Sequence, residues 1–125
     1  SFERRPATMF HTSGENFPVI IWAHNYYHES WETALARCQR VSGIFERHRE
    51  RGILNYLTTG IMNGEPVVCA TIQEAELCSR LLYQLEPGEN PQEELKKLNE
   101  SLRSIEEGSY SDVCDDSNCY RGTTR

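Results

Sequence analysis

Five cysteines are the side chains of this 125-residue sequence with the most obvious chemistry. Zinc sites need Cys or His ligands at short spacings, and these cysteines do not have them. Cys69 and Cys78 are nine residues apart, Cys114 and Cys119 are five apart, and no histidine lies near either pair at ligand spacing. Disulfide bonds in an oxidising compartment are therefore the favoured interpretation. The candidates are Cys38, Cys69, Cys78, Cys114 and Cys119, and because their number is odd, at least one thiol is free or bonds to another chain.

Aromatic residues gather in the stretch from Trp22 to Trp31, which also contains Tyr26 and Tyr27. Aromatic rings bring a large contact area to a binding surface, so this cluster is the candidate interface for a ligand or a protein. Core packing explains Trp22 and Trp31 equally well. Tyr26 and Tyr27 are therefore the residues of the cluster that indicate a binding surface more specifically.

His24 and His28 lie four residues apart in the same stretch, close to Glu29 and Glu32. On a helix these side chains could bind a divalent metal. The residues before them are typical of a strand, so the helical spacing fails, and we predict no metal site and no cofactor. A small-ligand or metal-binding protein that uses the His24–Trp31 segment is the alternative function.

Enzyme active sites have recognisable side-chain patterns, and we find none here. Cys38 could act as a nucleophile with His24 or His48, but it lies on the apolar stripe of its expected helix, where a buried or disulfide-bonded sulfur is typical. The serines lack a Gly-x-Ser-x-Gly elbow. Oxygen-bearing side chains between Asp112 and Asn118 lack the spacing of a calcium loop. We therefore predict that the protein is not an enzyme.

Charge and hydropathy exclude two classes of partner. The formal net charge of −6 argues against DNA or RNA, because phosphate binding needs a basic face. The sequence contains no run of 18 apolar residues, so we predict no transmembrane segment.

The order of predicted elements is strand, strand, helix, strand, strand, helix, helix. The first two strands are Ala7–Thr12 and Phe17–Ala23, followed by a helix with Ser30 as its N-cap and Gly52 at its end. Leu54–Met62 and Glu65–Thr71 form a hairpin around Asn63-Gly64, the strongest short-range hairpin signal.

Two further helices complete this prediction. Residues Thr71 to Glu74 have capping-box spacing, and the apolar residues from Leu77 to Leu85 continue at helical spacing. Asn90 caps the last helix, which Gly108 ends. We expect a single α+β domain over residues 1–108, with an antiparallel sheet of about four strands and helices packed on one face, and a polar tail over 109–125 that contains two cysteines.

Several motifs resemble the cyanobacterial circadian oscillating protein domain family. Arg37-Cys38-x-x-Val41-Ser42 is followed by Leu54-x-Tyr56-x-Thr58-x-Gly60-x-Met62-Asn63-Gly64 and then by Val68-Cys69. The resemblance covers about residues 17–102. It implies a cyanobacterial protein that is exported to the periplasm or thylakoid lumen, cycles daily in abundance and associates with membranes. It supplies no catalytic residues, so the function we expect is that of an accessory or interaction module that binds a partner protein at a membrane-associated assembly.

The resemblance also bears on the disulfides, because Cys38, Cys69 and Cys78 match cysteines of the family. Family members typically carry a further cysteine in the first strand, where this chain has Met9-Phe10-His11. We expect a Cys69–Cys78 bond. Whether Cys38 bonds to a C-terminal cysteine, or Cys114 to Cys119, stays open.

Overall fold

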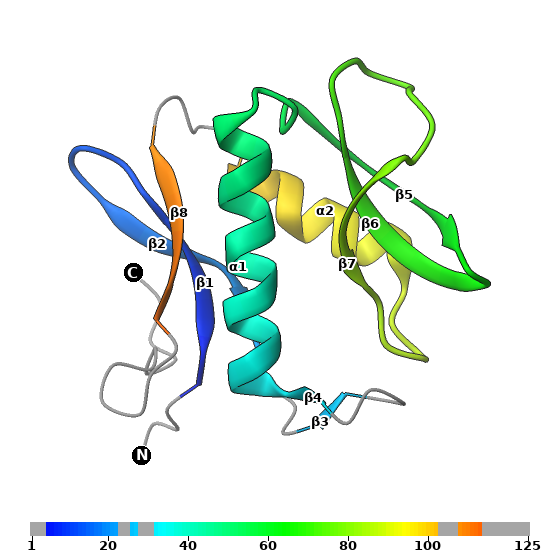
Figure 1. Ribbon diagram of the computed structural model, residues 1–125, viewed down its shortest axis with the longest axis horizontal. Coiled ribbons are helices and arrows are strands. Elements are labelled where there is room, and N and C mark those ends of the chain that lie inside the picture. The colour runs from blue at the N-terminus through cyan, green and yellow to red at the C-terminus, as the bar shows by residue number, and fades with distance from the viewer. Residues whose placement is uncertain (1–4, 23–25, 28–31, 103–107, 114–125) are drawn as a thin grey trace. The chain divides into compact units, whose positions relative to one another are not determined.

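A computed structural model describes residues 5–22, 26–27, 32–102 and 108–113 of the chain (Figure 1). The protein belongs to the α+β class, as predicted. Its elements are β1 (Ala7–His11), β2 (Asn16–Ile21), β3 (Tyr26–Tyr27), β4 (Glu32–Thr33), α1 (Ala34–Glu50), β5 (Tyr56–Met62), β6 (Glu65–Thr71), β7 (Arg80–Gln84), α2 (Pro91–Leu102) and β8 (Ser109–Val113).

The chain divides into two compact units instead of building one sheet of about four strands. Unit 1 comprises residues 1–43 and 104–125, and unit 2 comprises residues 44–103. Each unit has its own antiparallel sheet of three described strands, β2-β1-β8 in unit 1 and β5-β6-β7 in unit 2. Helix α1 begins in unit 1 and ends in unit 2.

Strand β1 is the centre of the sheet in unit 1. It pairs with β2 from Ala7↔Ile21 to His11↔Asn16, with a β-bulge between Thr8 and Met9. Four consecutive β1 residues are buried, which is typical of a strand with neighbours on both sides. The turn between β1 and β2 is closed by a hydrogen bond from the Thr12 amide to the Glu15 carbonyl (2.8 Å).

Strand β8 corrects the prediction of a polar tail from Ser109 onwards. It pairs antiparallel with β1, with Phe10 opposite Tyr110, and their rings pack edge to face with centroids 4.7 Å apart. Gly108 allows this close approach, because a Cβ there would lie 2.0 Å from the His11 carbonyl oxygen. Aromatic packing and a glycine thus outweigh the polar composition of the strand.

Helix α1 starts at Ala34, later than predicted. Glu32 and Thr33 pair with Tyr27 and Tyr26 as a short ribbon, and the Thr33 hydroxyl then accepts a hydrogen bond from the Ala36 amide (3.0 Å). Thr33 is therefore the N-cap, and the predicted cap, Ser30, lies outside the described residues.

The C-terminal end of α1 is at the glycine that the sequence indicated. Gly52 adopts a positive φ of 72°. The Gly52 amide donates to the Arg49 carbonyl and the Ile53 amide to the His48 carbonyl, both at 3.0 Å, which is a Schellman cap.

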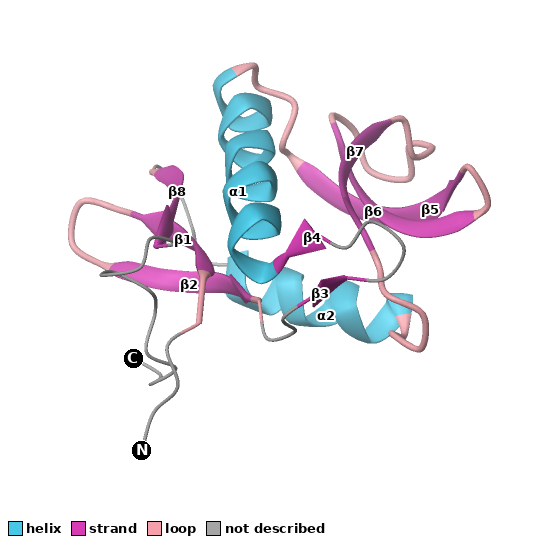
Figure 2. Cartoon of the chain, turned by 60° about the horizontal axis from the view of Figure 1, so that its bottom comes forward, coloured by secondary structure: helices cyan, strands magenta, loops and turns pink. Residues whose placement is uncertain are grey.

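The predicted hairpin is confirmed in unit 2. Asn63 and Gly64 have φ angles of 52° and 79°, as a type I′ turn requires. The pairing runs from Met62↔Glu65 at the turn to Tyr56↔Thr71, so β5 starts two residues later than predicted. Figure 2 shows the resulting sheet with α2 beneath it.

The helix predicted from Thr71 to Leu85 is wrong. Residues 72–79 form a loop, and residues 80–84 form strand β7, which pairs with β6. A bulge between Val68 and Cys69 buries Leu82 and Tyr83 in succession, and this breaks the alternation that marks a strand in a sequence.

Helix α2 has the predicted start. The Asn90 side chain accepts hydrogen bonds from the Gln92 and Glu93 amides (2.9 and 3.1 Å). Leu98 is 1% exposed in the core, and Glu94 accepts a 2.5 Å hydrogen bond from the Tyr83 hydroxyl of β7. The hydrogen bond between Tyr83 and Glu94 thereby links the helix to its sheet.

Candidate functional site: a disulfide-closed loop

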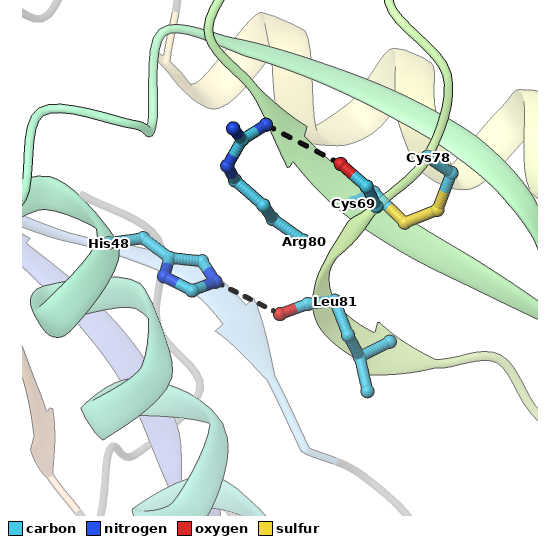
Figure 3. Close-up of a disulfide and its surroundings, with 6 residues drawn as sticks. His48, Cys69, Cys78, Arg80 and Leu81 are labelled. Carbon is cyan, nitrogen blue, oxygen red and sulfur yellow. Dashed lines mark hydrogen bonds between the residues drawn. A yellow bond between two sulfur atoms is a disulfide. The ribbon is translucent and has the colours of Figure 1, made fainter.

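The predicted Cys69–Cys78 disulfide is present in unit 2 (Figure 3). It joins the buried end of β6 to the loop over residues 72–79, and the two Cα atoms are 5.5 Å apart. We call residues 72–79 the disulfide loop. Figure 3 also shows His48 of α1, whose Nε2 donates to the Leu81 carbonyl (3.2 Å), so the strand that follows this loop is held as well.

A carboxylate inside the disulfide loop organises its backbone. Glu76 accepts hydrogen bonds from the amides of Ile72 (2.8 Å) and Gln73 (3.2 Å). Its second oxygen lies 3.3 Å from the Arg80 guanidinium. The pKa of Glu76 lies below its ordinary value, because hydrogen bonds favour the charged carboxylate. The backbone amide of Gln73 contributes most to this shift, followed by the amide of Ile72 and then by Arg80. The loop therefore has an internal cap as well as a covalent closure.

The disulfide loop also lies close against strand β5. A Cβ added at Gly60 would be 2.6 Å from the Cβ of Cys78, so only a glycine leaves room for the disulfide at this position. The glycine in the Leu-x-Tyr-x-Thr-x-Gly motif thus has a structural role that the sequence did not reveal.

Two apolar side chains of this closed loop face solvent. Leu77 is 86% exposed and Ile72 is 39% exposed. The predicted helix would have placed Leu77 on a buried apolar stripe, and the exposure of Leu77 shows that this part of the prediction is wrong. A single exposed leucine is common on protein surfaces, but this one is held on a loop that both a disulfide and the Glu76 cap fix in place.

Of the aromatic residues proposed as a binding surface, only Trp22 has a side chain that the structure describes. Trp22 is 4% exposed, so it belongs to the core of unit 1 and not to a surface. Its Nε1 donates to the Thr8 hydroxyl (3.1 Å), and the Arg37 guanidinium lies over its ring, 5.1 Å from the centroid. Thr8 also bonds to Ser42 of α1 (2.7 Å).

The rest of the cluster is largely beyond what the structure describes. Tyr26 and Tyr27 lie on β3, and their role as a surface stays a prediction. Trp31, His24 and His28 are outside the described residues.

Glu32, named in the alternative metal site, has a different partner. It forms a two-pronged salt bridge with Arg40, with both contacts at 2.8 Å. The hydrogen bond from Arg40 lowers the pKa of Glu32 despite partial burial. Elsewhere in the described ranges, no group of three His, Cys, Asp or Glu side chains could hold a metal ion.

The state of Cys38 decides whether this residue could act as the nucleophile considered in the sequence analysis. Cys38 is fully buried and disulfide-bonded, with a partner that the structure does not describe, so it is not a free thiolate. The alternatives for Cys114 and Cys119 lie outside the described residues.

Comparison with known proteins identifies the family of this α+β domain. The model of the family described as Circadian oscillating protein COP23 matches residues 1–119. The chain therefore belongs to the circadian oscillating protein family, which confirms the resemblance seen in its motifs. Neither the curated proteins nor the solved structures gave a match. Within the described residues, no helix is long and apolar enough to cross a membrane.

Proposed function

We propose that this protein is a non-enzymatic, exported interaction module, and that its disulfide loop binds a partner protein at a membrane-associated assembly. The observation that carries the proposal is the exposure of Leu77 on a loop that a disulfide and the Glu76 cap hold in place. A fixed loop loses little conformational freedom on binding, so its apolar side chains contribute more of their contact energy to affinity.

The charge of the disulfide loop indicates the kind of partner. Glu74 lies between its two exposed apolar residues, and the whole chain carries a net charge of −6. A partner with an apolar pocket and a basic rim would complement this surface. The rim charges would mainly raise the rate of association, and binding would weaken as salt is added.

The disulfides support export. Both Cys69 and Cys38 are disulfide-bonded, and such bonds persist in oxidising compartments such as the periplasm. Family membership agrees with an accessory role, and the bonded state of Cys38 removes the one thiol considered as a nucleophile.

The test compares the wild-type chain with Leu77→Ser and Ile72→Ser in co-sedimentation with membranes isolated from a cyanobacterium. We expect each variant to weaken binding, by about tenfold for Leu77→Ser, because burying an exposed leucine side chain in an interface contributes about 1.5–3 kcal/mol that serine cannot supply. Ile21→Ser is the matched control, since Ile21 in unit 1 is 40% exposed and Ile72 is 39% exposed. Equal binding by the wild type and both loop variants would contradict the proposal, as would full binding to protease-treated membranes.

A further inference from the structure

Strand β5 is an edge of the described sheet in unit 2, and its sequence has none of the features that usually protect such an edge. Its described neighbours in the sheet are β6 on one side and none on the other (Figure 2). An edge strand presents unpaired N–H and C=O groups to any other strand, so proteins usually protect it with a charge, a proline, a bulge or a short length. The seven residues of β5, Tyr56–Met62, contain no charge and no proline, and its pairing with β6 has no bulge.

The three other sheet edges each carry at least one such device. Strand β2 contains Pro18 and carries a bulge of its own, because Val19 is the extra residue between the pairs Thr8↔Ile20 and Met9↔Pro18. Strand β7 contains Arg80 and pairs through a bulge in its register with β6. Strand β8 contains Asp112. Strand β5 is therefore the exception among the edges of the two described three-stranded sheets.

The turn next to β5 determines which of its backbone groups point outwards. In a two-residue hairpin the closing pair, here Met62 and Glu65, exchanges both hydrogen bonds. Residues along β5 then alternate, so Leu57, Thr59 and Ile61 point their N–H and C=O groups away from β6. Ile61 is also 68% exposed.

We propose that β5 pairs antiparallel with the β5 strand of a second copy of this chain, around a two-fold axis at Thr59. In this register Thr59 lies opposite its own copy and Leu57 lies opposite Ile61. All three outward residues then exchange backbone hydrogen bonds. The apolar side chains meet one another, and no like charges approach, because the strand has no charged residue.

The size of the contact predicts a weak dimer. A pair of seven-residue strands buries less than the roughly 1,200–2,000 Å² of a standard stable interface. The two chains would therefore exchange readily, and association would become visible only at high protein concentration. This inference is independent of the disulfide loop and its proposed partner.

The test is sedimentation velocity of the oxidised full chain, with free thiol blocked, over a concentration series. We expect the wild type to self-associate and Thr59→Pro to raise the dissociation constant by about tenfold or more, because proline removes an outward N–H that β6 does not use. Thr59→Val retains that N–H and is the matched control. Ile61→Lys places a charge on the same edge and should also dissociate the dimer. This second variant keeps the test valid if the proline variant does not fold.

Hydrogen exchange provides the residue-level readout. The amides of Leu57, Thr59 and Ile61 should gain protection as concentration rises, while those of Thr58 and Gly60, which face β6, should be protected throughout. A wild type that stays monomeric at millimolar concentration would overturn the inference, and so would a dimer that Thr59→Pro and Ile61→Lys leave intact. Leu77→Ser should not affect self-association, so failure here is distinguishable from failure of the loop proposal.

Discussion

The two sheets resemble each other in plan but hold their central strands by different chemistry. Each has three described antiparallel strands, and each has a β-bulge in its register. In unit 1 the central strand β1 is tied to α1 through Thr8, whose hydroxyl bonds to Ser42 and accepts the Trp22 indole N–H. In unit 2 the central strand β6 is tied to its following loop by the Cys69–Cys78 bond.

This difference teaches how each unit should respond to change. A buried hydrogen-bond network fails when one member is lost, because the partners left behind remain buried without a bond. A disulfide acts mainly by restricting the unfolded chain, so its removal lowers the free energy of unfolding even when the contacts of the folded state are kept. Unit 1 should therefore be sensitive to the loss of single polar groups, and unit 2 to the loss of its covalent closure.

The largest expected effect is the loss of the closure in unit 2. Cys69→Ala with Cys78→Ala should lower the free energy of unfolding by about 3 kcal/mol, the loop-entropy value for so short a loop. Alanine at position 78 keeps the Cβ that lies against Gly60, so the close packing is retained. Urea denaturation measures the change. A loss below about 1 kcal/mol would indicate that strand pairing alone fixes the disulfide loop.

The hairpin in unit 2 and the helix caps were predictable because their signals are local. Asn63 and Gly64 supply the positive φ angles of their turn, and Gly52 and Asn90 cap helices through neighbouring backbone groups. The Cys69–Cys78 pairing was expected from the family motifs and is confirmed. Short-range chemistry of this kind is visible in the sequence.

Strands β7 and β8 could not be predicted because partners distant in sequence decide them. The leucines from Leu77 to Leu85 have helical spacing, but pairing of residues 80–84 with β6 and the bond from Cys78 override that propensity. Strand β8 depends on packing of Tyr110 against Phe10, a hundred residues earlier. The exposed position of Leu77 in the candidate site follows from this same tertiary pairing, so it was missed with β7.

The next largest effect tests the network of unit 1. Thr8→Val removes the hydroxyl that bonds to both Trp22 and Ser42, and it should cost about 1–3 kcal/mol, because two buried polar groups lose a partner. Ser42→Ala alone and the double variant complete a cycle in urea denaturation. We expect a coupling energy of about 0.5 kcal/mol or more between the two positions. Strictly additive losses would mean that the hydroxyls do not act as a network.

The smallest effect compares one carboxylate in each unit. The pKa of Glu32 is lowered first by the side chain of Arg40, whereas that of Glu76 is lowered first by the backbone amide of Gln73. Arg40→Gln should therefore return the pKa of Glu32 towards its ordinary value of 4.5, while Arg80→Gln should leave most of the shift at Glu76. Carboxyl titration by NMR measures both.

The pH dependence of stability follows from the direction of these shifts. A carboxylate with a lowered folded-state pKa adds stability above its unfolded pKa, and this contribution is lost as pH falls through the folded value. The salt bridge of Glu32 is partly exposed, so Glu32→Gln should cost less than about 1 kcal/mol at pH 7 and progressively less below pH 4.5. Because Arg40 keeps its charge throughout this range, Arg40→Gln should remove the same pH-dependent step. If the step persisted in Arg40→Gln, the side-chain pair would not be its cause, and the contrast with the backbone-held Glu76 would fail.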